Sequence, residues 1–118
     1  MWKFKDVNFD EEFAQWEQLQ HQLTELFKHK SESKIELMSL GIQLFESILV
    51  KVEEITFQRE EIAQSTVSPL NVSERYEFVL SNSGNYAAFR QLDELFKETK
   101  KIIARKRVME RAQATESL

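Results

Sequence analysis

The stretch from Pro69 to Phe96 constrains the fold more than any other part of this sequence. Asn71, followed three residues later by Glu74, has the pattern of a capping box, in which two side chains satisfy free backbone N–H groups at a helix start. A short apolar-rich run follows, and the letters S-N-S-G-N at 81–85 are the strongest turn signal in the chain. After that turn, apolar side chains recur every three or four positions, which is typical of an amphipathic helix. The stretch therefore predicts a short helix, a tight turn and a long helix.

The first half of the chain shows the same helical spacing twice. Asn8 with Glu11, and Ser33 with Glu36, have the capping-box pattern and mark two further helix starts. Apolar residues then recur at steps of three and four in both segments, and each set predicts one buried helical stripe. The first set is Phe13, Trp16, Leu19, Leu23, Leu26 and Phe27, and the second is Met38, Gly41, Ile42, Phe45, Ile48, Leu49 and Val52.

The glycine in the second of these helices indicates how the helices pack. Glycine costs about 1 kcal/mol relative to alanine in a helix interior. We therefore expect close approach of a neighbouring helix at Gly41, for instance beneath Trp16.

The whole chain of 118 residues fits one domain. It contains two glycines and one proline, and this scarcity of turn-forming residues argues against a β-rich fold. The prediction is an all-α fold, a single helical domain over 1–118 in the form of an antiparallel helical bundle of three to five helices. We also expect an N-terminal aromatic arm at 1–9 and a frayed tail at 112–118. The segment 53–69 is an uncertain connector that can be read as a helix extension, a short helix or a loop, although 65–69 is a connector on any reading.

The composition bounds both the chemistry and the location. Cysteine is absent, which excludes disulfides, thiol nucleophiles and cysteine-bound zinc or iron–sulfur centres, and which fits a reducing compartment. No apolar run approaches the roughly 20 residues of a membrane-spanning helix, and the first six residues do not resemble a secretory signal. The scarcity of glycine also argues against phosphate-binding loops. We therefore expect a cytoplasmic protein with no membrane contact.

One helical face carries residues that could bind a metal ion or transfer protons. Glu17, His21 and Glu25 follow one another at steps of four and so share a face. Di-metal bundles pair an acidic residue with a histidine three positions later on two helices, and neither histidine of this chain has that partner. We therefore interpret the face as solvated. No serine, aspartate and histidine set belongs to a catalytic motif either, so we expect no enzymatic activity, no metal and no cofactor.

The best candidate interaction surface is a basic run near the C-terminus. Residues 97–118 include 7 basic and 3 acidic side chains, whereas residues 1–64 include 7 basic and 13 acidic ones. The basic run could contact nucleic-acid phosphates, an acidic protein partner or the acidic half of a second copy in a homo-oligomer, or it could be a solvated helix end. No aromatic residue is interleaved with the cations, which argues against single-strand binding. The candidate residues are Lys97, Lys100, Lys101, Arg105, Lys106, Arg107 and Arg111.

A second charged feature is Arg75, which lies in the short apolar-rich helix. We expect it to be partly buried and paired with a carboxylate of the long helix, Asp93 or Glu94, and we take Glu94 as the partner. Such a pair would be structural, because breaking a buried ion pair costs about 3–5 kcal/mol.

Two adjoining signatures connect the chain to a known family. They are N-V-x-E-R-x-x-F-x-L, which begins at Asn71, and Y-x-x-F-x-Q-L-x-E-L-F, which begins at Tyr86, with a weaker G-I-x-L-F at Gly41. On these residues, which together span about half of it, the chain resembles the YpoC-like family of small bacterial helical proteins. The family is functionally uncharacterised, so the resemblance implies no catalytic residues. Because its members are often encoded near DNA replication and repair genes, the resemblance raises the expectation of a nucleoprotein-associated role. The chain departs from the family in having no glycine or proline in the connector over 52–66.

The sequence therefore predicts a non-catalytic accessory or protein–protein interaction module. An unknown protein partner could dock on the basic end of the long helix or on the aromatic arm around Trp2 and Phe4. The alternative is a nucleic-acid-associated accessory protein in a replication or repair context, which binds through the basic C-terminal helix.

Overall fold

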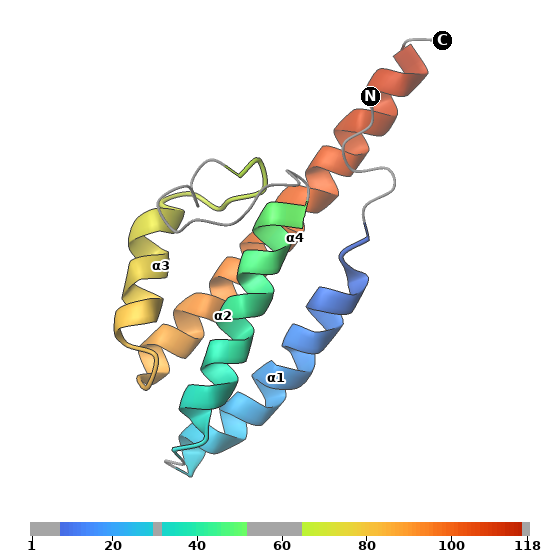
Figure 1. Cartoon of the computed structure of the whole chain (residues 1–118). Coiled ribbons are helices and arrows are strands. Elements are labelled where there is room, and N and C mark those ends of the chain that lie inside the picture. The colour runs from blue at the N-terminus through green and yellow to red at the C-terminus, as the bar shows by residue number, and fades with distance from the viewer. Residues whose placement is uncertain (1–7, 30–31, 52–64, 117–118) are drawn as a thin grey trace.

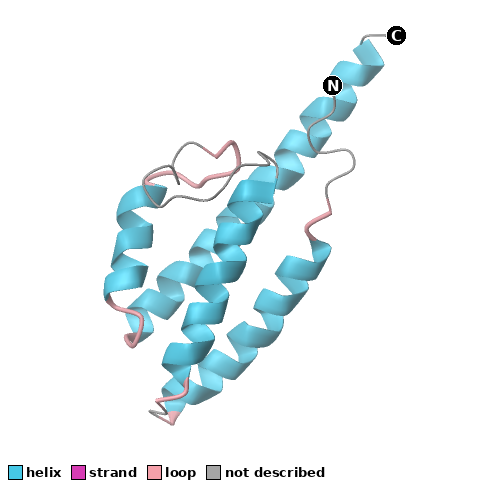
Figure 2. Ribbon diagram, in the orientation of Figure 1, coloured by secondary structure: helices cyan, strands magenta, loops and turns pink. Residues whose placement is uncertain are grey.

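The computed structural model describes residues 8–29, 32–51 and 65–116, and this part of the chain folds as four α-helices (Figures 1 and 2). The helices are α1 (Asp10–Lys28), α2 (Lys34–Lys51), α3 (Val72–Ser81) and α4 (Tyr86–Glu116). Within these described ranges no residue belongs to a β-strand, and no helix is both long and apolar enough to cross a membrane. The predicted all-α class is confirmed.

The four helices alternate in direction along the bundle (Figure 1). α1 and α2 form one antiparallel hairpin, and α3 and α4 form a second one. α4 packs against each of the other three helices, and α1 and α4 run antiparallel to one another. The antiparallel bundle predicted from the sequence is confirmed, with α4 as the helix on which the others assemble.

Aromatic side chains fill the interior where α1, α2 and α4 meet. The Trp16 indole stacks on the Phe96 ring, with centroids 4.3 Å apart and an interplanar angle of 6°. Phe45 and Phe89 are fully buried beside them. The ring of Phe45 contacts Phe96 at 5.5 Å, and the ring of Phe89 contacts Trp16 at 6.3 Å. Such ring pairs stabilise a core by more than the burial of their apolar area alone. This cluster therefore stabilises the packing of α1 against α4.

The glycine of α2 makes room for this tryptophan. A Cβ atom at Gly41 would stand 2.5 Å from Cζ3 of Trp16 and 3.3 Å from Cδ2 of Leu92. The first distance is far inside van der Waals contact, so a side chain at this position would displace the indole. The close approach predicted at Gly41 is confirmed, and the neighbour is Trp16.

The helix starts agree with the sequence in position but not always in chemistry. The N-cap of α1 is Phe9, and no side chain caps this helix. Asn8 lies one residue earlier, where its Oδ1 accepts a hydrogen bond of 2.8 Å from the Asp10 backbone N–H. At the start of α3, Asn71 has a left-handed backbone with φ of 57°, and its side chain makes no capping hydrogen bond. Asparagine tolerates this conformation better than most residues, so it turns the backbone into α3 instead of capping the helix. The capping boxes predicted for Asn8 with Glu11 and for Asn71 with Glu74 were therefore wrong, although both helix starts were correctly placed.

The described part of the connector is anchored to the bundle. Val67 and Pro69 are buried, and Oγ of Ser65 donates a hydrogen bond of 2.7 Å to the Leu49 carbonyl near the end of α2. Residues 65–71 form turns and bends without regular helix, which agrees with the connector expected at 65–69. The predictions for 53–64, and for the arm at 1–7 with Trp2 and Phe4, lie outside the described residues.

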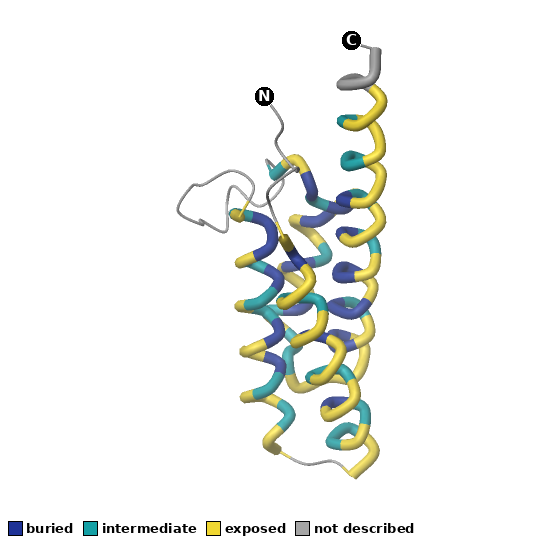
Figure 3. Tube along the Cα trace, turned by 90° about the vertical axis from the view of Figure 1, so that its right-hand side faces the viewer, coloured by how far each residue is buried: buried dark blue, intermediate teal, exposed yellow. Residues whose placement is uncertain are grey.

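α4 extends well past the other three helices (Figure 3). Its first half contributes a row of buried apolar side chains to the core, namely Ala88, Phe89, Leu92, Leu95 and Phe96. The described side chains from 104 onward are exposed or half-buried, yet the helix continues to Glu116. Alanine, glutamate, arginine and lysine dominate this segment, and their high helix propensity accounts for a helix that little packing supports. The fraying that we expect over 112–118 stays a prediction, because part of that range lies outside the described residues.

Candidate protein-interaction surface on α4

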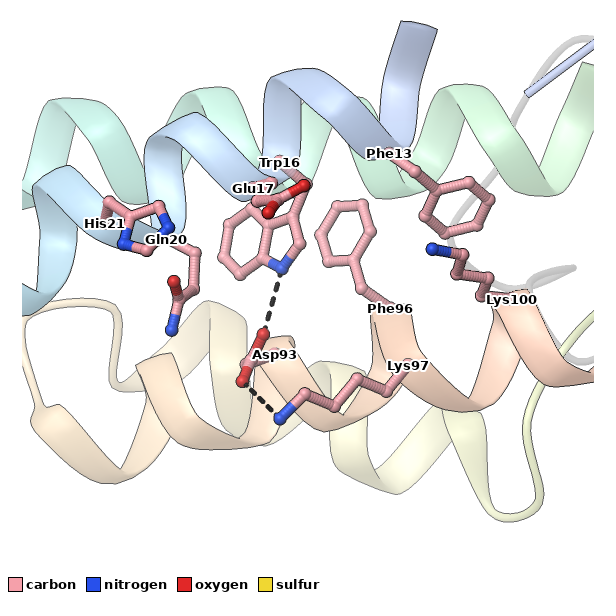
Figure 4. A pocket seen from close by; sticks show the side chains of 9 residues that line it. All are labelled: Phe13, Trp16, Glu17, Gln20, His21, Asp93, Phe96, Lys97 and Lys100. Carbon is pink, nitrogen blue, oxygen red and sulfur yellow. Dashed lines mark hydrogen bonds and ion pairs between the residues drawn. The ribbon is translucent and has the colours of Figure 1, made fainter. Parts of the chain in front are cut away.

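A surface groove lies between α1 and α4 (Figure 4). Its volume is about 400 Å³, which is within the usual range for binding sites in proteins. The rings at its base are largely covered, since Trp16 is 5% and Phe96 1% exposed, and most of the other lining side chains are charged or polar. The lining residues are Phe13, Trp16, Glu17, Gln20 and His21 on α1, and Asp93, Phe96, Lys97 and Lys100 on α4.

Asp93 joins the two helices at the base of this groove. Its Oδ1 accepts a hydrogen bond of 3.1 Å from Nε1 of Trp16, and its Oδ2 lies 3.0 Å from Nζ of Lys97 (Figure 4). The Asp93 side chain is 5% exposed, whereas that of Lys97 is 55% exposed. No group in the described residues donates a hydrogen bond to Oδ2, so its contact with Lys97 is an ion pair without hydrogen-bond geometry. Burial of a charged carboxylate costs free energy unless polar or cationic groups contact it. The Trp16 indole N–H and the Lys97 ammonium provide these contacts to Asp93.

The rims of the groove carry side chains that are only weakly engaged. Nζ of Lys100 stands 5.7 Å from the centre of the Phe13 ring, and no carboxylate of the described residues pairs with it. On the other rim, Glu17 and His21 are exposed, as is Glu25 further along the same face of α1. In the part of the chain that the structure describes, no three carboxylate or imidazole groups are close enough to hold a metal ion.

The structure divides the seven basic candidate residues into two groups. Lys106 and Arg107 are half-buried, and the Arg107 guanidinium lies 5.7 Å from the centre of the buried Phe9 ring. Nζ of Lys51 lies 5.4 Å from the same ring. Arg107 and Lys51 therefore both pack on Phe9, just before the start of α1. The other five are exposed, and at 100° per residue they fall within an arc of about 140° on one face of α4. We call this set the basic stripe: Lys97, Lys100, Lys101, Arg105 and Arg111.

Two apolar side chains that the sequence did not single out accompany the basic stripe. Val108 is 61% exposed and Met109 is 59% exposed. Helical spacing places Val108 between Arg105 and Arg111 on the same face of α4. Arginine and methionine are enriched at protein interfaces and lysine is depleted there, so the outer part of the stripe, with Arg105, Arg111, Val108 and Met109, resembles an interface more than the part with the lysines does.

Arg75 attaches α3 to α4 on another face of the bundle. Its guanidinium binds both carboxylate oxygens of Glu98, with Nη1 at 2.9 Å from Oε1, and Nη1 also donates to the Leu70 carbonyl at 3.0 Å. The Gln91 amide oxygen, in the orientation that satisfies its neighbours, accepts from Nε of Arg75 at 2.7 Å. The side-chain hydrogen bond between Arg75 and Glu98 is the main cause that raises the pKa of the arginine and lowers the pKa of the glutamate.

The partner predicted for Arg75 was therefore wrong, because it is Glu98 and not Glu94. Gln91 and Glu98 are seven residues apart, so they lie nearly in line along α4 and face α3. Asp93 faces α1 instead, where Trp16 and Lys97 occupy it. Glu94 is half-exposed, lies 3.8 Å from Lys97 and acts on Arg75 only as a more distant charge.

The contact between Asp93 and Trp16 was not predicted, although a signal for it exists. Asp93 follows Phe89 by four residues and precedes Phe96 by three, so it occupies a buried position of the apolar stripe. A polar residue at such a position requires a partner. No sequence rule identifies that partner, because Trp16 is 77 residues away.

The fold and this surface define a class of protein, a small antiparallel helical bundle whose last helix presents a basic stripe beside a groove lined by aromatic and charged side chains. The family model for the YpoC-like protein matches residues 6–111, and the chain belongs to this family. The resemblance seen in the sequence is confirmed. Comparison with curated proteins and with solved structures gives no match.

Proposed function

We propose that this YpoC-like protein is a cytoplasmic, non-catalytic interaction module that binds an acidic surface of a protein partner through the basic stripe. The observation that supports this proposal best is the projection of α4, whose outer half carries exposed cations and Val108 on one face (Figure 3). The cysteine-free composition supports the reducing compartment.

The charge of this segment favours an acidic partner. Over residues 97–111 the chain has 7 basic and 2 acidic side chains. One of the acidic residues, Glu98, is occupied by Arg75. Complementary charge accelerates the encounter and selects the partner, while buried apolar contacts supply much of the affinity. Val108 lies within the basic stripe and Met109 just beside it, so both are available for such contacts.

Binding of nucleic acid is the second candidate, and the five exposed cations on one helix face favour it. Cations of this kind neutralise phosphates, and the affinity then falls steeply with salt. Two features favour a protein partner over this candidate. The basic stripe contains no aromatic side chain for base stacking, and Val108 in its middle is apolar.

A charge-reversal variant tests the proposal. Purified wild type and the double variant Arg105→Glu/Arg111→Glu are used to capture partners from a native cell extract, and each captured protein is then purified and titrated alone. The expected result is an acidic partner that binds the wild type directly and loses at least about tenfold in affinity to the variant. The variant Lys28→Glu makes the same kind of charge change at the exposed end of α1 and should bind normally.

The same experiment separates the rival candidates. Titration with duplex and single-stranded DNA at two salt concentrations should show no salt-sensitive binding. If DNA binds and reversal of Arg105 and Arg111 abolishes that binding, the nucleic-acid function replaces the proposed one. If the captured partner is a second copy of this chain, sedimentation will show a dimer that the reversal dissociates.

A further inference from the structure

The outer half of α4, from residue 104 onward, has an amphipathic pattern that is separate from the buried row of the first half. Four of its exposed side chains stand at positions i, i+3, i+4 and i+7, so at 100° per residue they share an arc of about 100° on one side of the helix. We call this set the distal face: Arg105, Val108, Met109 and Ala112. This spacing is the one by which a helix places its side chains into a groove of another protein.

The distal face is accessible to a partner without any change in the bundle. Val108 is 61% and Met109 59% exposed, whereas Arg107 contacts the Phe9 ring from the opposite side of the helix. The outer half also extends past the other three helices, so a partner can approach it without displacing them (Figure 3). Because the buried first half already holds the backbone in place, binding does not require a new helix to form.

We infer that the distal face inserts as a helix into a groove of the acidic partner, with Val108 and Met109 on an apolar floor and Arg105 against an acidic wall. The inference rests on the proposed function and specifies the shape and chemistry of the surface that the partner offers. A flat acidic surface would attract the cations but would leave much of the two apolar side chains in water. A groove contacts the arginine and covers the apolar side chains together, which is the usual arrangement when an amphipathic helix is recognised.

Charge determines which kind of groove fits. Residues 104–112 contain 4 basic side chains and 1 acidic side chain, so a groove with acidic walls attracts this segment. Arg105 stands three residues before Val108, and Arg111 stands three residues after it. Two copies of the distal face would therefore bring arginines together, and this repulsion disfavours a second copy of the chain as the occupant.

The probe for this chemistry is calmodulin, used in two states. Its lobes open a methionine-rich apolar groove when calcium binds and close it when calcium is removed. The open groove accepts many basic amphipathic helices. The protein is acidic in both states and offers the groove in only one of them, so the comparison separates an inserted helix from attraction between charges alone.

Two measurements on the full chain give the expected result. Isothermal titration calorimetry should show binding of calcium-loaded calmodulin and at least about tenfold weaker binding of the calcium-free form. Backbone hydrogen exchange should locate the contact, because a helix enclosed by a groove opens less often. The amides of 104–112 should exchange at least about tenfold more slowly in the complex, and those of α1 should be unchanged.

Matched variants identify the side chains that carry the binding. Val108→Ser/Met109→Ser removes the apolar part of the distal face and should lower the affinity for calcium-loaded calmodulin at least about tenfold. Leu40→Ser/Leu70→Ser makes the same kind of change at side chains that are 49% and 80% exposed elsewhere, and it should leave the affinity within about twofold. Arg105→Glu should lower the affinity about tenfold. All five side chains are exposed, so these variants should fold, and unchanged melting temperatures will verify this.

Each outcome decides the inference. If calcium-free calmodulin binds equally well and Val108→Ser/Met109→Ser has no effect, charge alone is responsible, so the groove inference fails and the proposed function stands. If Leu40→Ser/Leu70→Ser lowers the affinity as much, the contact lies elsewhere and the inference is overturned. If calcium-loaded calmodulin does not bind, the inference is also overturned, and the capture experiment decides the proposed function separately.

Discussion

The two halves of α4 are one continuous helix, but they are stabilised in different ways. The first half buries Phe89, Leu92, Leu95 and Phe96 against three other helices. The outer half exposes Arg105, Val108, Met109 and Arg111 along a segment that extends past the bundle (Figure 3). Packing against the other helices stabilises the first half. The outer half has little such packing, and the high helix propensity of its residues stabilises it.

In a bundle of this size, binding is expected at exposed residues that the packing of the core does not require. Substitutions of the buried residues in the first half should change the free energy of unfolding, and substitutions of exposed residues in the outer half, such as Arg105 and Val108, should change binding alone. Four predictions test this separation, from the largest expected effect on stability to the smallest.

Trp16→Ala should have the largest effect, because it removes the ring that stacks on Phe96 and the hydrogen bond to Asp93. Loss of a buried large aromatic side chain costs about 3–5 kcal/mol. Chemical denaturation monitored by circular dichroism will measure the free energy of unfolding. A loss below about 1 kcal/mol would show that the aromatic cluster does not stabilise the bundle as described.

Gly41→Ala should destabilise the protein by about 1–3 kcal/mol, although alanine is the better helix former. The cause is the overlap of the new methyl group with Cζ3 of Trp16. Thermal unfolding of this variant, of Trp16→Leu and of the double variant completes a thermodynamic cycle with the wild type. The penalty of Gly41→Ala should largely disappear in the double variant, because the smaller side chain at position 16 leaves room for the methyl group. An undiminished penalty would assign the cost to another contact.

Arg75→Ala should cost about 1–2 kcal/mol, because the pair with Glu98 is partly exposed and solvent screens it. The pair also makes stability depend on pH. The pKa of Glu98 in the folded protein lies below its ordinary value of 4.5, so the stabilisation is present above that value and is lost as the pH falls through the lowered pKa. Denaturation of the wild type and Glu98→Gln across this acidic range checks the sign. The difference between them should shrink as the pH falls, and a difference that grows would contradict the assignment.

Val108→Ala should change the free energy of unfolding by less than about 0.5 kcal/mol, because the side chain is mostly exposed. The same substitution should lower the affinity for the partner that the basic stripe binds. Thermal unfolding and titration with the purified captured partner are carried out on the same sample. A large loss of stability here would show that the outer half of α4 is packed against the rest of the chain.

Much of the fold could be predicted from residues that are close in the sequence. Helical spacing located all four helices that the structure describes, and the turn at 81–85 separates α3 from α4 as expected. Gly41 also indicated close approach of a helix, because a helix interior admits glycine at a cost. The candidate site was predicted only as a set of cations, since the sequence could not show that Arg107 covers Phe9 while Arg105 is exposed.

Local spacing and composition by themselves determined that this chain is an all-α bundle with a basic final helix, because helix formation depends on neighbours three and four residues apart. Only the tertiary structure decided that Asp93 binds Trp16, that Arg75 binds Glu98 and that a groove opens between α1 and α4. These contacts depend on the rotation of each helix about its axis, which the packing of distant side chains sets.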